Sequence, residues 1–130
     1  MVITETIKTH SRNEWIDITS QVNSAVAKSG IKDGIAVVFC PHTTAAISIN
    51  ENADPTVPKD LTKKLAALIP EHDHYEHSEG NSDAHLKASL VGAQETLIID
   101  NGKLILGTWQ SVYFCEFDGP RTRHFHIKII

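Results

Sequence analysis

The sequence has few of the residues and segments that mark secreted or membrane proteins. Its two cysteines, Cys40 and Cys115, are far apart and form no CxxC pair, which is typical of a reduced intracellular chain rather than a disulfide scaffold. No apolar run approaches the roughly 18 residues that a membrane helix needs. The segment Met1–Glu5 has no basic stretch followed by an apolar one, so no secretory signal is expected. We therefore expect a cytoplasmic protein with no membrane partner.

An excess of positive charge is also absent. The chain carries 12 Lys and Arg residues against 16 Asp and Glu, a net charge of −4 at pH 7. This balance argues against binding along the phosphate backbone of a nucleic acid. Neither a P-loop nor a GxGxxG fingerprint for nucleotides occurs. With 130 residues the chain has room for one domain, 1–130, because domains usually contain about 100–200 residues.

Local patterns predict about seven strands and three short helices. The predicted strands are Val2–Lys8, Ile35–Cys40, Ala45–Asn50, Thr96–Ile99, Lys103–Leu106, Gln110–Asp118 and Arg123–Ile130. The predicted helices run from Thr19 or Ser20 to Gly30, from Pro58 to Pro70, and from a capping Ser82 to Gly92. Asn101-Gly102 between two apolar segments predicts a hairpin. Because hairpin connections dominate, we expect an α+β fold with mainly antiparallel sheet.

Histidine is the residue present in unusual number. Of eight histidines, four lie close together: His72, His74, His77 and His85. His85 falls in the first turn of the predicted third helix, where the partial positive charge of the helix end disfavours imidazolium. A neutral imidazole is the form that binds a metal ion. The segment His77–His85 therefore favours a metal site, with a solvated His-rich loop as the alternative.

Two other motifs place polar groups next to predicted strands. Pro41–Thr44 puts His42 at a strand end, where functional sites are often built; an exposed turn is the alternative. Asn50–Pro55 contains two carboxylates and two amides. Glu51 or Asp54 could serve as a general acid/base or as a metal-binding oxygen, although Asn, Asp and Pro are also the ordinary residues of turns.

Two further motifs lie in the C-terminal part. In Gly107–Gln110, Trp109 could line a pocket for a planar ring, but core packing is the interpretation we favour. In the segment 116–123, Arg121 and Arg123 follow a Gly-Pro turn and could bind phosphate in a bidentate manner. A cross-strand face of salt bridges with Glu116 and Asp118 is the commoner outcome for such a pattern. Cys40 and Cys115 are predicted to be small buried residues.

Together these motifs resemble the YjbQ-like family, which carries the name secondary thiamine-phosphate synthase. The resemblance covers essentially the whole chain, and the motifs occur in the family's order. It implies an α+β fold with a β-sandwich core, assembled as a homotrimer. It also implies a pocket in which His42, His77 and His85 match the family's histidines, while Glu51 and Asp54 match its acidic turn. His10, His72, His74, His124 and His126 are left as surface residues.

The family name implies an enzyme that joins hydroxymethylpyrimidine diphosphate to a thiazole phosphate with loss of pyrophosphate. The small phosphorylated heterocycle would be its substrate. A divalent metal, zinc in the first instance, would be held by His42, His77 and His85. Catalytic roles would fall to Glu51, His42 and Asp54. The substrate-binding residues would be Thr43, Thr44, Asn50, Asn81, Trp109, Gln110, Arg121 and Arg123.

Three alternatives stay open at this point. If water were the nucleophile, the same site would be a metal-dependent phosphohydrolase. If Glu51 or Asp54 closed the metal site as a fourth ligand, the chain would be a non-catalytic metal- or ligand-binding trimer. If no metal were bound, His42 and a carboxylate could carry out ordinary acid/base chemistry.

Overall fold

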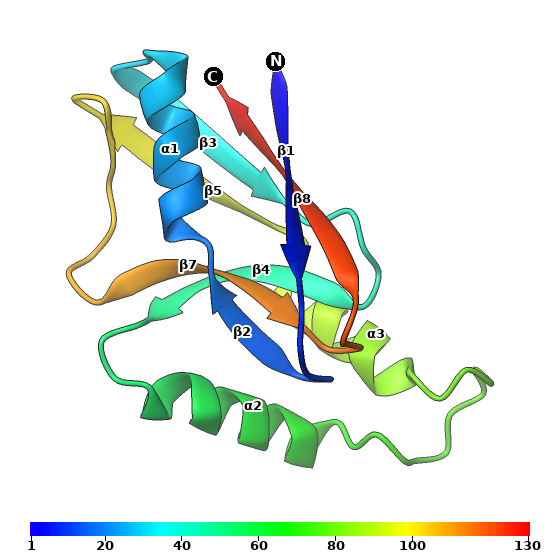
Figure 1. The fold of residues 1–130 in the computed structure, drawn as a ribbon. Helices are drawn as coiled ribbons and strands as arrows, with labels where there is room; N and C mark the ends of the chain where they lie inside the picture. The colour runs from blue at the N-terminus through cyan, green and yellow to red at the C-terminus, as the bar shows by residue number, and fades with distance from the viewer.

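Two antiparallel sheets form the frame of the computed structural model, which describes all 130 residues (Figure 1). The first sheet has the strand order β1-β8-β3-β5-β6 and the second has the order β2-β7-β4. The strands are β1 (Val2–Lys8), β2 (Glu14–Asp17), β3 (Asp33–Phe39), β4 (Ala45–Glu51), β5 (Gln94–Asp100), β6 (Lys103–Leu104), β7 (Gln110–Glu116) and β8 (Thr122–Ile129). The α+β class and the antiparallel pairing are as predicted.

The main hydrophobic core joins both sheets and the first helix, α1 (Thr19–Ser29). Successive side chains of strand β7 point to opposite faces of the sheet and therefore pack in two different hydrophobic clusters. Val112 and Phe114 belong to the main cluster, whereas Tyr113 and Cys115 belong to a second, smaller cluster. Ala84 and Ala88 of helix α3 (Ser82–Val91) join that second cluster. The sheet β2-β7-β4 is therefore covered on one face by the core and on the other by α3.

Helix α2 (Thr56–Leu68) is attached much more loosely, along β2 (Figure 1). It has no buried residue, and Leu68 at its end is 66% exposed. Its start was predicted at Pro58, which is wrong. Asp54 Oδ1 accepts hydrogen bonds from the N–H and the hydroxyl of Thr56 at 2.9 and 2.7 Å, and this turn starts the helix two residues earlier. None of the three helices has the length and apolar character that crossing a membrane requires.

Other local predictions need smaller corrections. Strand β2 was not predicted, because it has only four residues and its pairing with β7 is decided by tertiary contacts. Ser82 is the first residue of α3 and not its cap; Asn81 precedes the helix, without a side-chain capping bond. The hairpin at Asn101-Gly102 is confirmed, with φ of 52° and 77° at these residues and Asp100 paired with Lys103.

A buried ion pair lies at the end of β7. Arg123 donates from Nε and Nη2 to the two carboxylate oxygens of Glu116, at 2.9 and 2.6 Å, and neither residue is more than 5% exposed. Thr9 adds a hydrogen bond at 2.7 Å. Burial by itself raises the pKa of Glu116, but the hydrogen bonds from Arg123, Thr9 and the Asp118 N–H outweigh it, so the pKa lies below its ordinary value.

We predict that Glu116→Gln destabilises the protein by about 3 kcal/mol near pH 7, because it leaves the buried Arg123 without a counter-charge. The folded-state pKa of Glu116 is depressed, so its stabilising effect is present above the ordinary value and is lost as pH falls through the folded-state pKa. Urea denaturation should therefore show a much smaller difference from wild type at pH 3 than at pH 7. The exposed Glu79→Gln is the control. An equal difference at both pH values would contradict the prediction.

Candidate functional site

Three segments that are far apart in sequence line one polar cavity of about 430 Å³. They are the loop after β3, the loop that leads into α3, and the turn between β7 and β8. Except for Pro41, all of the lining residues are polar or charged. The lining consists of Pro41, His42, Thr43, Thr44, His77, Glu79, Asn81, His85, Asp118, Arg121 and Arg123. The structure thus brings together three of the five motifs singled out in the sequence.

Arg121 is the cationic group in this cavity that is free to meet a ligand. Its side chain is 52% exposed, and Asp118 holds it in two ways. Arg121 Nε donates to the Asp118 carbonyl oxygen at 2.7 Å, and Nη2 donates to the Asp118 carboxylate at 3.0 Å. Asn81 donates to the same carboxylate oxygen at 2.9 Å. One edge of the guanidinium is fixed by these bonds.

Arg123 lies at the floor of the cavity and differs from Arg121. Besides its pair with Glu116, its Nη2 donates to the Thr44 hydroxyl at 2.8 Å. The Glu116–Arg123 pair agrees with the salt-bridge alternative, although β7 and β8 belong to different sheets, and it occupies the guanidinium that was predicted to bind phosphate. The turn before it is tightly packed, since a methyl group at Gly119 would collide with the carbonyl oxygen of Ser11.

The His42 ring continues the hydrogen-bonding ladder between β3 and β8. That ladder ends where Phe39 pairs with His126. Beyond that pair, His42 Nε2 lies 2.9 Å from the backbone nitrogen of His124 and 3.1 Å from its carbonyl oxygen, and its tautomer decides whether it accepts from the first or donates to the second. Burial and the nearby Arg123 lower the pKa of His42, although the hydrogen bond with the His124 backbone acts in the opposite direction. His42 is therefore neutral near pH 7.

His77 and His85 form a second pair on the other side of the cavity. Their rings meet edge to face with centroids 5.4 Å apart, and Glu79 lies 3.8 Å from His77 Nε2. No group of three or more His, Cys, Asp or Glu side chains is placed to hold a metal ion. The expected set of His42, His77 and His85 is not gathered into a three-histidine centre, and His42 Nε2 is engaged with the backbone of His124.

The remaining two motifs meet at the opposite end of the second sheet. Glu51 pairs with Gln110 at the end of β4, whereas Ala45, at its start beside the cavity, pairs with Glu116. Seven residues of strand span about 20 Å. Glu51, Asn50, Trp109 and Gln110 are therefore too far from His42 to act with it inside one chain.

The side chains in this second cluster are mostly engaged locally or exposed. Asn50 Oδ1 accepts the Glu51 N–H, and Gln110 Oε1 accepts the Gly107 N–H, both at 2.8 Å. The hydrogen bonds from Thr56 lower the pKa of Asp54, as expected for a carboxylate that shapes a turn. Trp109 is 62% exposed, so the favoured interpretation of Trp109 as a core residue is wrong.

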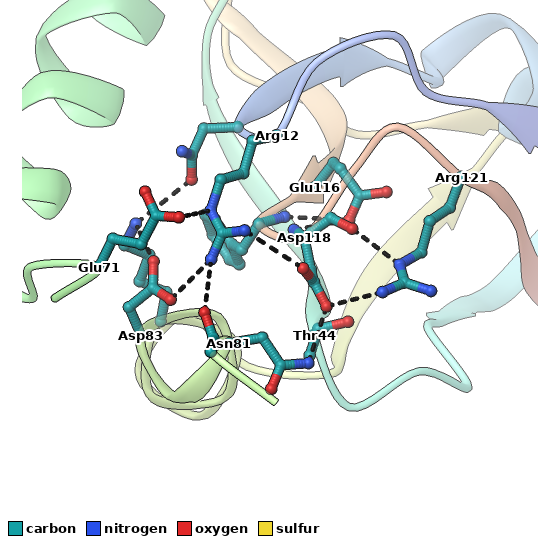
Figure 2. A network of polar contacts seen from close by, with 12 residues as sticks. Arg12, Thr44, Glu71, Asn81, Asp83, Glu116, Asp118 and Arg121 are labelled. Atoms are coloured by element: carbon teal, nitrogen blue, oxygen red, sulfur yellow. Dashed lines mark hydrogen bonds and ion pairs between the residues drawn. The ribbon is translucent and has the colours of Figure 1, made fainter. Parts of the chain in front are cut away.

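Sequence reasoning missed the polar network behind the cavity (Figure 2). Arg12, from the loop between β1 and β2, reaches Asp83 at 2.9 Å and Asp118 at 3.5 Å. Asp83 also pairs with Lys87 at 3.2 Å, and both of these side chains are at most 2% exposed. A charged i, i+4 pair such as Asp83 and Lys87 was a visible signal, but such pairs usually lie on solvated helix faces.

The cysteines are free and buried, as predicted. Burial raises the pKa of Cys40 to about 11 and that of Cys115 well above its ordinary value. Neither thiol is a nucleophile for this site. The chemistry available in the cavity therefore comes from imidazoles, one guanidinium edge and carboxylates.

Comparison with known proteins agrees with the resemblance found in the motifs. A UPF0047 protein of Methanocaldococcus jannaschii is 57% identical over 124 residues, covering 95% of this chain and 90% of that protein. YugU of Bacillus subtilis, another UPF0047 protein, is 53% identical over 131 residues, covering 100% of this chain and 99% of YugU.

Solved structures extend the agreement to three dimensions. A YjbQ/UPF0047 protein of Clostridium acetobutylicum superposes with a TM-score of 0.98 at 56% identity, covering 98% of this chain and 99% of that one. A Sulfolobus solfataricus protein, described as YbjQ-like and of unknown function, superposes with a TM-score of 0.95 at 36% identity, covering 99% and 95%. A family model described as UPF0047 protein YjbQ-like matches residues 3–130. The chain belongs to the YjbQ-like UPF0047 family.

Proposed function

We propose that this chain is an enzyme that binds a small phosphorylated molecule in the cavity of His42, His85 and Arg121. The observation that carries the proposal is the half-exposed Arg121 guanidinium, fixed on one edge by Asp118 and open to the cavity. A guanidinium held in this way is suited to phosphate or diphosphate oxygens, because its planar fork matches their geometry.

The start of α3 adds a second favourable element for an anion. Asn81 and His85, on either side of the first turn of this helix, both line the cavity. The N-terminal end of a helix carries a partial positive charge and free N–H groups, which favour a phosphate. Arg121 and this helix end would therefore act on the same negative charge.

The reaction we propose is a displacement at a carbon that bears a diphosphate, as in thiamine-phosphate synthesis. The thiazole nitrogen attacks the methylene carbon of the pyrimidine, a C–N bond forms, and the C–O bond to pyrophosphate breaks. Arg121 would stabilise the charge that develops on the departing pyrophosphate. His42, neutral and hydrogen-bonded through Nε2 to the backbone of His124, would help to shape the cavity. His77 and His85 are the candidates for proton transfer.

A phosphohydrolase is the second candidate, supported by the same cavity. With water in place of the thiazole, the bond that breaks would be a P–O bond and the products would be an alcohol and phosphate. Such a reaction needs a base to accept a proton from water. The His77–His85 pair, with Glu79 close to His77, is the group placed for that task.

We predict that Arg121→Ala weakens pyrophosphate binding by roughly 10- to 100-fold, because charge-assisted hydrogen bonds are lost. Isothermal titration of wild type and variant measures this directly. The exposed Lys103→Ala, at the distant hairpin, is the control and should bind as wild type does. Formation of thiamine phosphate from the two substrates, or release of phosphate from phosphomonoesters, then separates synthase from hydrolase. Equal pyrophosphate affinity in wild type and Arg121→Ala would make the proposal wrong.

A divalent metal, zinc in the first instance, stays a prediction for this site. His77 and His85 are the two histidines close enough to share an ion. We predict that any zinc taken up, measured by elemental analysis after dialysis, is lost in His77→Ala and His85→Ala and is retained in His42→Ala. Loss of zinc in His42→Ala would contradict this assignment. An absence of uptake by wild type would make the zinc prediction itself wrong.

A homotrimer is the assembly we propose, and two observations support an assembly of some kind. Helix α2 has no buried residue, and Phe39 and Ile98 on the first sheet are 40% and 60% exposed. An interface between chains would also allow Glu51 and Trp109 of one chain to approach the cavity of another. We predict that light scattering coupled to size-exclusion chromatography gives about three times the chain mass of 14.3 kDa. A monomeric mass at all concentrations would contradict the trimer.

A further inference from the structure

All three arginines of the chain gather at one end of the molecule, around the β7–β8 turn. Arg123 pairs with Glu116, while Arg121 and Arg12 both contact Asp118. The nine lysines are spread over other parts of the chain, and only Lys87 joins this network. Arginine differs from lysine in presenting several donors from one rigid plane. Its confinement to this end indicates a site where the direction of several bonds matters.

Arg12 is the arginine with the most widely separated partners. It lies within 3.5 Å of Glu71 and Asp118, and at 2.9 Å from Asp83. Asp83 and Asp118 are at most 9% exposed, and carboxylates so far from water need a positive partner. The Gly119 N–H also donates to the Arg12 carbonyl oxygen at 3.1 Å. Arg12 thus links the β1–β2 loop, the start of α3 and the β7–β8 turn.

Arg12 is connected to the cavity through the two carboxylate oxygens of Asp118 (Figure 2). Oδ1 faces Arg12 at 3.5 Å, whereas Oδ2 accepts from Arg121 at 3.0 Å and from Asn81 at 2.9 Å. A carboxylate is planar, so fixing the position of Oδ1 also fixes the direction of Oδ2. The ion pair with Arg12 therefore acts together with Asn81 to orient the Asp118 carboxylate toward Arg121.

The same guanidinium fixes the second half of the cavity. Arg12 Nη2 donates to Asp83 Oδ1 at 2.9 Å and to the Gly80 carbonyl oxygen at 3.4 Å. These two residues flank Asn81 and Ser82, at the point where α3 begins. Asn81 and His85 enter the cavity from this segment. One side chain outside the cavity thus contacts two of the three segments that line it.

We infer that Arg12 is a positioning residue, which holds Arg121 through the carboxylate of Asp118 and holds the start of α3 through Asp83 and Gly80. The inference that this serves phosphate binding rests on the proposed function. The contacts of Arg12 themselves do not depend on that function.

Arg12→Lys separates positioning from charge, because it keeps the positive charge and removes the planar fork. We expect this variant to bind pyrophosphate about tenfold more weakly than wild type. In an Arg121→Ala background, Arg12→Lys should weaken binding clearly less than it does in the wild-type background, since only its contacts with the start of α3 are then left to act. Equal effects of Arg12→Lys in both backgrounds would overturn the inference.

Glu71→Gln is the matched control. Glu71 is the partner of Arg12 on the exposed side, with a side chain that is 45% exposed. Its loss leaves the contacts of Arg12 with Asp83 and Asp118 in place, so we expect unchanged pyrophosphate affinity. A loss as large as that of Arg12→Lys would assign the effect to the general charge of the network and would overturn the inference.

A ligand-free measurement distinguishes failure of this inference from failure of the proposed function. With three arginines, the Nε–H region of a ¹H–¹⁵N spectrum contains three signals. The Arg121 signal, assigned by its loss in Arg121→Ala, reports the orientation of a guanidinium that bonds the Asp118 carbonyl oxygen through Nε and the Asp118 carboxylate through Nη2. We expect it to shift or broaden in Arg12→Lys, and also in Asp118→Asn should Arg12→Lys not fold. An unchanged Arg121 signal would overturn the inference even if pyrophosphate binds; a shifted signal without pyrophosphate binding would retain the positioning and remove the proposed ligand.

Discussion

The carboxylates at the end of β7 are the constraint on which the rest of this structure depends. Glu116 and Asp118 are buried at a turn where the chain reverses into β8, and buried carboxylates are costly unless each is paired and hydrogen-bonded. Arginines from different positions supply those partners. In doing so they tie the β1–β2 loop, the Thr44 loop and α3 to one point, and the polar cavity forms between the segments that meet there.

Arg121 and Arg123 have different roles because their side chains differ in exposure. Arg123 is buried and fully committed to Glu116 and Thr44, so it supports the floor of the cavity. Arg121 is half exposed and keeps one edge free. A binding group whose position is fixed before the ligand arrives loses less entropy on binding. The arrangement around Asp118 therefore favours a preorganised site over a flexible one.

The two clusters of motif residues lie at opposite ends of β4 and β7, and this bears on how the family's motifs work together. His42 and Arg121 lie at one end, and Glu51 and Trp109 lie at the other. Within one chain only the first group can share a ligand. Joint action of all five motifs therefore requires that two chains meet, which connects the proposed chemistry with the proposed homotrimer.

The sequence by itself determined the elements whose signals are local. The antiparallel α+β class, the Asn101-Gly102 hairpin, the position of His85 in the first turn of α3 and the family all follow from alternation, turn residues and motif order. Tertiary structure alone decided the rest, because it depends on contacts between distant segments. Which strands and loops pack together decided the pairing of β2 with β7, the contact of His42 Nε2 with the β8 backbone, the burial of Asp83 and Lys87, and the separation of Glu51 from His42. Spacing along the chain carries no information about those distances.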